Sequence, residues 1–207
     1  MVYNIENKIL IKIKKAGRGT LFFSDNFASF GSAETVRRTL NRLVEKGELD
    51  RVSQGIFVRS QIDNIIGKIT PKIEDIAEAI ARRDKAKIVP TGAYALNRLG
   101  LSTQVPMNIV YLTDGSARKV KVGNYTISFI RTSPKNVSAT GKISRLVIQA
   151  LKSIGKENIN QTEIEHIQNI LLNEKIVYLE QDLRIAPAWI KEIIRYSLDK
   201  LKNNEQE

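Results

Sequence analysis

Residues 32–59 constrain the fold most, because they place a helix pattern directly before two short strand patterns. Ser32 is suited to cap the helix, since its hydroxyl can accept a hydrogen bond from an unpaired N–H group of the first turn. Gly47 is suited to end it, because a left-handed backbone favours a residue without Cβ. Between them, apolar residues recur at helical spacing and form one stripe: Ala33, Val36, Leu40, Leu43 and Val44. The segment therefore predicts a helix that packs along one face and exposes the other.

The exposed face of this helix is polar and largely basic. It carries Glu34, Thr35, Arg38, Asn41, Arg42 and Glu45, with Arg37 at its edge. Two strand-like runs follow, at 49–52 and 56–59, on either side of the turn Ser53-Gln54-Gly55. A helix of this kind followed by a small hairpin is typical of a winged helix-turn-helix, so the segment predicts DNA binding.

The residues before this segment complete the expected order of elements. An apolar pattern predicts a first helix over residues 5–16, and residues 20–23 form an extended run after a glycine-rich break. Ser24 is placed to cap a short second helix, and Gly31 makes the turn into the third. Helix, short helix, glycine turn, helix and hairpin is the order of a winged helix-turn-helix. We therefore expect a DNA-binding domain at residues 1–66.

Side-chain chemistry predicts roles on the basic face. Arginine can bind guanine through two hydrogen bonds, and asparagine can bind adenine in the same way. We therefore expect Arg38, Asn41 and Arg42 to read bases. Thr35 belongs to the same DNA-facing set, and the side chains more suited to phosphate are Arg37, Arg51, Gln54, Arg18 and Arg59. Two other interpretations stay open, a solvated helix face and a winged helix that docks a protein.

The composition favours a negatively charged partner, since the 207 residues carry a formal charge of +11. With 42% hydrophobic residues the chain can bury one or two cores. No apolar run approaches the roughly 20 residues of a membrane span, and the N-terminus is unlike an export signal. The lack of cysteine excludes disulfides and thiolate metal sites. We expect a soluble cytoplasmic protein with no membrane contact.

The positive charge is concentrated in the middle of the chain. Residues 82–145 hold 12 Lys and Arg against 2 Asp and Glu, a balance of +10, whereas residues 1–70 have a balance of +5. Arg118, Lys119 and Lys121 are the candidates for a secondary basic surface here. Such a surface would attract nucleic acid without sequence preference, or would bind an acidic protein. General solubility is an equally acceptable interpretation.

Residues 67–207 are expected to form a mixed α/β C-terminal domain with a small sheet, after a joint at 63–70. Pro71 is placed to open a helix. Strand patterns lie at 87–90 and 108–113, with a helix from Thr91 to Gly100 between them. Gly123-Asn124 predicts a tight hairpin in which Val122 faces Tyr125, Val120 faces Ile127, and Lys119 and Lys121 fall opposite Ser128 and Thr126. This register gathers the apolar residues on one face and the polar ones on the other.

Three helices are expected to complete this α+β protein, within residues 143–201. The first spans 143–154, and the second opens at Thr162, which has capping-box spacing to Glu165. The third begins at Pro187 and carries a wide apolar face that we expect to be core: Trp189, Ile190, Ile193, Ile194, Leu198 and Leu201.

Three stretches resemble the AbiEi family of antitoxins from abortive-infection (AbiE) toxin–antitoxin systems. They are GELDRVSQGIFVR, TGAYALNRLGLSTQVP and NIVYLTDGSARKVKVGNYTISFI, and the resemblance covers roughly residues 5–200. It implies an autoregulating repressor that binds inverted repeats in its own promoter through the winged helix, with a C-terminal domain needed against a nucleotidyltransferase-like toxin. By the same resemblance, the DNA role falls on Arg37, Arg38, Asn41, Arg42, Arg51 and Gln54.

Catalysis is not expected, nor is any cofactor or metal. The only histidine, His166, lies in a helix rich in Glu and Gln and is interpreted as an exposed filler. No GxxxxGK[ST] phosphate loop occurs. Asp114 is the only acidic residue between Arg98 and Arg145, so the basic region lacks the converging carboxylates of a metal-dependent nuclease.

Two alternatives to a sequence-specific repressor remain. The protein could be an interaction module that neutralises a partner toxin and binds nucleic acid only non-specifically, or, less favoured, a nucleic-acid-processing enzyme. Because one reading helix covers half of a palindrome, a repressor would act as a dimer or as cooperative monomers.

Overall fold

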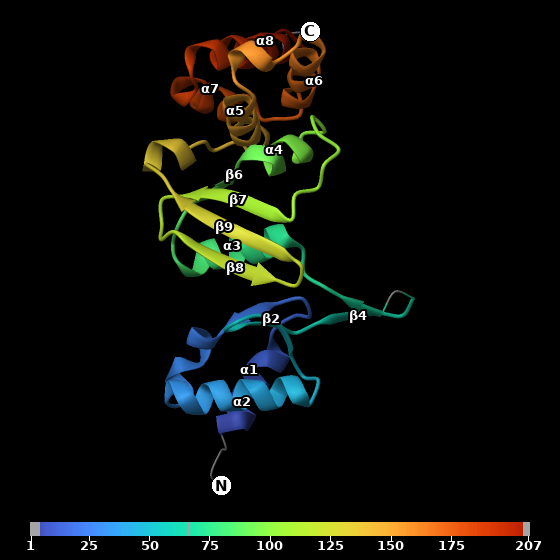
Figure 1. The fold of residues 1–207 in the computed structure, drawn as a ribbon, viewed down its shortest axis with the longest axis vertical. Coiled ribbons are helices and arrows are strands. Elements are labelled where there is room, and N and C mark those ends of the chain that lie inside the picture. The colour runs from blue at the N-terminus through green and yellow to red at the C-terminus, as the bar shows by residue number, and fades with distance from the viewer. Residues whose placement is uncertain (1–4, 66, 205–207) are drawn as a thin grey trace. The chain divides into compact units, whose positions relative to one another are not determined.

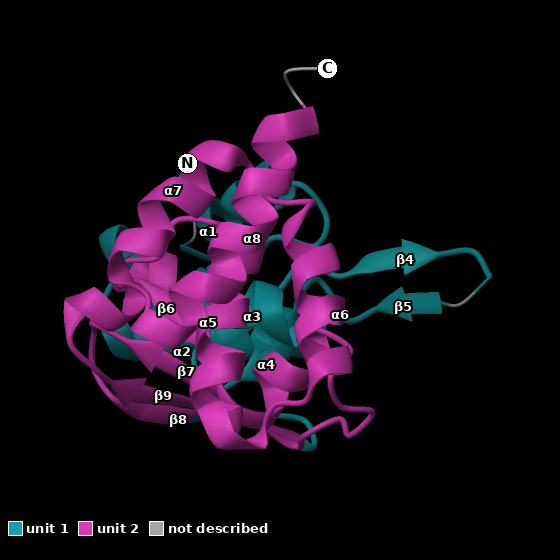
Figure 2. Ribbon diagram, turned by 90° about the horizontal axis from the view of Figure 1, so that it is seen from above, with its two compact units in different colours: residues 1–80, 120–124 teal, residues 81–119, 125–207 magenta. Residues whose placement is uncertain are grey.

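The computed structural model describes residues 5–65 and 67–204 and has an α+β fold (Figure 1). The chain divides into two compact units, coloured separately in Figure 2. The first comprises Met1–Ile80 and Val120–Asn124, and the second comprises Ala81–Lys119 and Tyr125–Glu207. Within the described ranges, no helix is both long enough and apolar enough to cross a membrane.

Three helical segments enclose the core of the first unit: α1 (Ile5–Lys15), the 3-10 helix η1 (Ser24–Phe30) and α2 (Ala33–Glu45). Their shared core is apolar and aromatic: Ile9, Ile13, Phe22, Phe27, Val36, Leu40, Leu43, Leu49 and Phe57. The predicted ends of α2 are confirmed. The hydroxyl of Ser32 accepts a hydrogen bond from the Thr35 amide at 3.2 Å, and Gly47 has a φ of +73°. The predicted cap at Ser24 is wrong, because the Asn26 side chain instead accepts from the Phe23 amide at 2.8 Å.

A three-stranded antiparallel sheet follows, with the order β1-β3-β2. Its strands are β1 (Leu21–Phe23), β2 (Asp50–Ser53) and β3 (Ile56–Val58). The predicted hairpin is confirmed as β2 and β3, with Gly55 at a φ of +70° in the turn. The extended run at 20–23 is β1, which pairs with β3 so that Phe22 lies opposite Phe57.

The expected joint at 63–70 overlaps a second hairpin, although residue 66 lies outside the described residues. Its strands β4 (Gln61–Asp63) and β5 (Gly67–Ile69) pair antiparallel. Helix α3 (Ile73–Arg83) comes next. Its predicted start at Pro71 is wrong by two residues, because the first turn closes between the Ile76 amide and the Lys72 carbonyl.

The remaining strands form a four-stranded sheet with the order β6-β7-β9-β8. They are β6 (Ile88–Pro90), β7 (Asn108–Thr113), β8 (Arg118–Val122) and β9 (Tyr125–Arg131). The β8–β9 hairpin confirms the Gly123-Asn124 turn, and β7 runs parallel to β9. The predicted sorting of polar and apolar faces is wrong at Ser128, which is buried and donates a hydrogen bond to Asn108 Oδ1 at 2.8 Å. An inner strand is covered more completely than the alternating pattern indicates.

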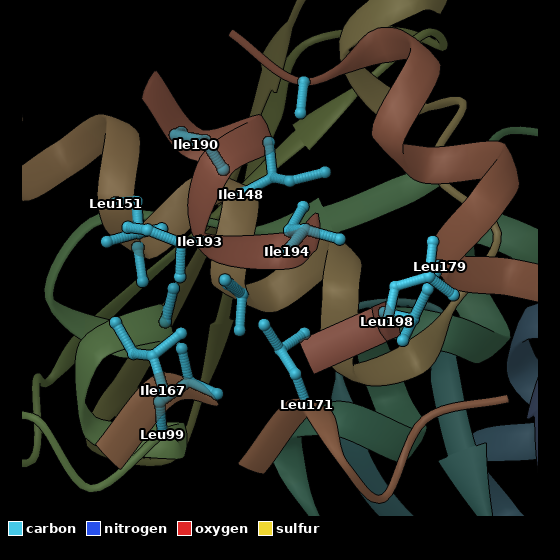
Figure 3. Close-up of a cluster of buried hydrophobic side chains, with 14 residues drawn as sticks. Leu99, Ile148, Leu151, Ile167, Leu171, Leu179, Ile190, Ile193, Ile194 and Leu198 are labelled. Atoms are coloured by element: carbon cyan, nitrogen blue, oxygen red, sulfur yellow. The ribbon is translucent and has the colours of Figure 1, made fainter. Parts of the chain in front are cut away.

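Among the described residues, the second unit has five further α-helices, which pack around the cluster drawn in Figure 3, and two 3-10 helices that contribute no residue to it. They are α4 (Gly92–Arg98), η2 (Pro134–Val137), α5 (Lys142–Ile154), η3 (Lys156–Asn158), α6 (Gln161–Leu171), α7 (Ile176–Ile185) and α8 (Ala188–Asn204). Predicting three helices at the end of the chain was wrong, because α7 is an additional one. The residue that caps α6 is Asn160 rather than Thr162. The apolar face of α8 is core, as predicted, with Ile190 and Ile194 fully buried.

Candidate nucleic-acid interface

The outer face of α2 exposes the arginines that were predicted to contact DNA, Arg38 and Arg42 at bases and Arg37 at phosphate. The side chains of Arg37, Arg38 and Arg42 are 65%, 75% and 54% exposed. Asn41 lies half-buried on the same helix, and Thr35 is exposed in its first turn. The Thr35 hydroxyl lies 2.8 Å from the Ser32 hydroxyl, so this side chain also belongs to the helix cap.

Glu34 holds two of these arginines at the start of α2. Its carboxylate accepts hydrogen bonds from Arg37 Nε at 3.1 Å and Nη2 at 2.8 Å, and from Arg38 Nε at 2.7 Å. The hydrogen bonds from Arg37 and then Arg38 lower the pKa of Glu34 below its usual value. One carboxylate therefore contacts both arginines on the exposed face of the helix.

Glu6 of α1 plays a similar part at the other end of α2. It pairs with Arg42 at 3.4 Å and with Lys46, and its side chain is only 13% exposed. The hydrogen bond from Lys46 is the main reason that the pKa of Glu6 is lowered, and the positive charge of Arg42 acts in the same direction. This contact links α1 to α2, and sequence reasoning missed it because the partners are far apart along the chain.

The hairpin β2–β3 brings Arg51 to the same helix. Arg51 donates a hydrogen bond to Asn41 Oδ1, and its guanidinium lies 5.4 Å from the centre of the Phe57 ring. Gln54 is exposed in the turn between the strands. The structure thus brings Asn41 and Arg51 together, although they belong to different elements.

Arg18 and Arg59 bind the protein's own backbone. Arg59 Nη1 donates to the Lys14 carbonyl at 2.9 Å and to the Ala16 carbonyl, and Arg18 Nη1 donates to the Ser60 carbonyl at 3.0 Å. These bonds tie the loop after α1 to the end of β3. Both arginines therefore have a structural role that the sequence pattern did not reveal.

The secondary basic surface splits into two sides of β8, because successive side chains of a strand point to opposite faces. Arg118 pairs with Asp84, and its guanidinium lies 5.5 Å from the centre of the Phe129 ring. Lys119 and Lys121 are exposed. The structure therefore brings the two lysines together and separates Arg118 from them.

His166 has a defined partner. Its Nε2 lies 2.8 Å from the Leu99 carbonyl oxygen, so the exposed residue is a link between α6 and the end of α4 rather than a mere filler. In residues 5–65 and 67–204, no three His, Asp or Glu side chains lie together as a group that could hold a metal ion.

Comparisons with known proteins place the chain in a family. No curated protein matches the sequence. A family profile matches residues 8–179, which include parts of both compact units. The chain belongs to DUF6088, a family of unknown function.

Proposed function

We propose that the first unit is a winged helix-turn-helix that binds double-stranded DNA sequence-specifically, and that the protein is a transcriptional repressor. In this proposal α2 enters the major groove and the β2–β3 hairpin is the wing. The major groove is wide enough for one helix and offers a distinct hydrogen-bonding pattern for each base pair.

The observation that carries the proposal is the exposed face of α2. Its guanidinium and amide groups belong to a helix whose opposite, apolar face is packed in the core. Leu40 and Leu43 of that helix are fully buried, whereas Arg38 is 75% exposed. Base readout requires this combination, because directional hydrogen bonds discriminate only when their donors are held in place.

The proposed roles follow the chemistry of each group. Arg38 and Arg42 bind guanine, and Asn41 binds adenine. Thr35, Arg37, Arg51 and Gln54 contact the flanking phosphates and set the position of the helix. Arg18 and Arg59 keep the loop after α1 in place, within reach of the backbone of the DNA.

The resemblance to AbiEi antitoxins extends the proposal to the biological setting. The target is then an operator with inverted repeats upstream of the protein's own gene, bound by a dimer or by cooperative monomers. The second unit would counter a nucleotidyltransferase-like toxin encoded nearby. A nucleotidyltransferase gene next to this one, whose product co-purifies with the protein, would support the antitoxin role.

The double variant R38A/R42A tests the DNA-binding role. We expect it to lose discrimination between the upstream DNA and a scrambled duplex, while it keeps its fold and most of its non-specific affinity. Each good arginine–guanine contact accounts for about 1–3 kcal/mol of discrimination. The measurement is competition binding of both duplexes at physiological salt.

The matched control is R195A/K200A, which removes the same charge from two exposed positions of α8. Its discrimination should equal that of the wild type. If R38A/R42A discriminates as well as the control, α2 does not read bases. A protein partner for the basic surfaces then becomes the better proposal.

A further inference from the structure

Glu34 is the one acidic residue in the first turn of α2, and it stands among the proposed DNA contacts. Its side chain is 49% exposed even though it binds two arginines. A surface carboxylate in a DNA-binding face is unexpected from charge alone, because it repels phosphate.

The geometry around Glu34 leaves part of Arg38 unused. Arg38 reaches the carboxylate only through Nε, at 2.7 Å, whereas Arg37 uses both Nε and Nη2. Among the described residues, the two Nη nitrogens of Arg38 have no hydrogen-bond partner. A guanidinium anchored at Nε presents these two donors as a fork, which matches the O6 and N7 acceptors of guanine.

The chemistry of a carboxylate defines what Glu34 itself can recognise. An ionised carboxylate only accepts hydrogen bonds. In the major groove, Glu pairs with the N4 amino group of cytosine. In helix-turn-helix proteins the first residues of the reading helix are the ones that contact base edges.

We propose that Glu34 is a specificity residue: when Arg37 leaves Oε2 for a phosphate, Oε2 accepts a hydrogen bond from a cytosine amino group while Oε1 keeps Arg38 directed towards a guanine. This inference rests on the proposed DNA-binding function. At sequences without an amino group in reach, the carboxylate enters the groove unpaired and close to phosphates. Glu34 therefore weakens binding to the wrong sequences as well as favouring the right one.

The test is selection of bound sequences from a randomised duplex pool by the wild type, E34A and E34Q. The wild type should restrict one position of each half-site to a C·G pair, and replacing that pair should weaken binding about 5- to 150-fold. E34A should lose that restriction and bind a scrambled duplex several-fold more tightly. E34Q should shift the preference towards adenine, because a carboxamide both donates and accepts.

The matched control is E45A, which removes a carboxylate from an exposed position in the last turn of the same helix. It should keep the preference of the wild type. Glu34 could instead act only on the helix, through its position near the N-terminus. E34A would then have a lower melting temperature but an unchanged base preference, and this result would overturn the inference.

The failures of the two proposals are distinguishable. If R38A/R42A loses discrimination while E34A keeps every base preference, Glu34 is not a specificity residue and the DNA-binding proposal stands. If the wild type selects no sequence from the pool, both proposals are overturned together.

Discussion

Helix α2 and strand β8 both expose cations, but they differ in how those cations are held. On α2, Arg37 and Arg38 share Glu34, and Arg42 pairs with Glu6. On β8, Lys119 and Lys121 are exposed and make no ion pair among the described residues. Held guanidinium groups present donors in fixed directions, whereas a lysine ammonium on a flexible stem acts as a point charge. In the proposed function, this difference separates a surface that discriminates between DNA sequences from one that only attracts nucleic acid.

The largest expected effect comes from truncating a core side chain beneath the exposed face of α2. Leu40 is fully buried in the core of the first unit. Leu40→Ala should lower the free energy of unfolding by about 2–5 kcal/mol, through lost apolar burial and a cavity. Denaturant unfolding measures this loss. Val177→Ala, at a position 58% exposed in α7, is the control and should stay within about 0.5 kcal/mol of the wild type.

Asn41 tests whether one side chain of α2 reads one base. Asn41→Ala should cost about 1–3 kcal/mol of discrimination at a single A·T pair of the operator. It should also release Arg51, whose hydrogen bond to Asn41 is lost. Binding to operators with single substitutions measures the effect. Gln54→Ala, in the turn between β2 and β3, should weaken binding to all operator sequences alike. If Asn41→Ala also weakened binding to all of them alike, Asn41 would not read a base.

The lysines of β8 test the other side of the comparison. The double variant K119A/K121A should lower affinity equally for the upstream and scrambled duplexes. The slope of log affinity against log salt should fall by about 1 for each lysine that meets a phosphate. Titrations over a salt series measure both. An unchanged slope would leave these lysines to a protein partner.

The smallest expected effect concerns pH and the pairing of Glu34. Its pKa lies below the usual 4.5, so the folded protein favours the ionised carboxylate. The stabilisation is therefore complete above about pH 4.5 and is lost as the pH falls through the lowered pKa. Glu34→Gln lacks this titration, so its difference in stability from the wild type should shrink between pH 7 and pH 3. A constant difference in denaturant unfolding would show that ionisation of Glu34 does not stabilise the fold.

Local signals made α2 predictable, and distant partners made other parts unpredictable. The cap at Ser32, the apolar stripe and Gly47 each act within the helix or at its ends. The contact between Glu6 and Arg42 joins two helices and leaves no spacing signal. The hydrogen bonds from Arg59 to the backbone also join residues that are far apart in the sequence, so no local pattern predicts them.

Helix α7 was not predicted, although Ile176, Leu179 and Leu183 recur at helical spacing and pack into the core; its buried face also carries a polar residue. Asp182 is 1% exposed and accepts hydrogen bonds from the Thr140 and Gly141 amides at 2.8 and 2.9 Å. Asp182 thereby satisfies backbone N–H groups at the start of α5. In the sequence alone, an aspartate at this position indicates an exposed, solvent-facing side chain. Burial of a satisfied carboxylate depends on tertiary structure.

Binding of the protein to its own upstream DNA shows whether α2 reads a base sequence. The comparison is with a scrambled duplex of equal length, over a salt series. We predict a preference of about tenfold or more that survives at physiological salt, where non-specific binding has weakened. Equal and steeply salt-sensitive binding to both duplexes would contradict the claim, because the charge would then attract DNA without any reading by α2.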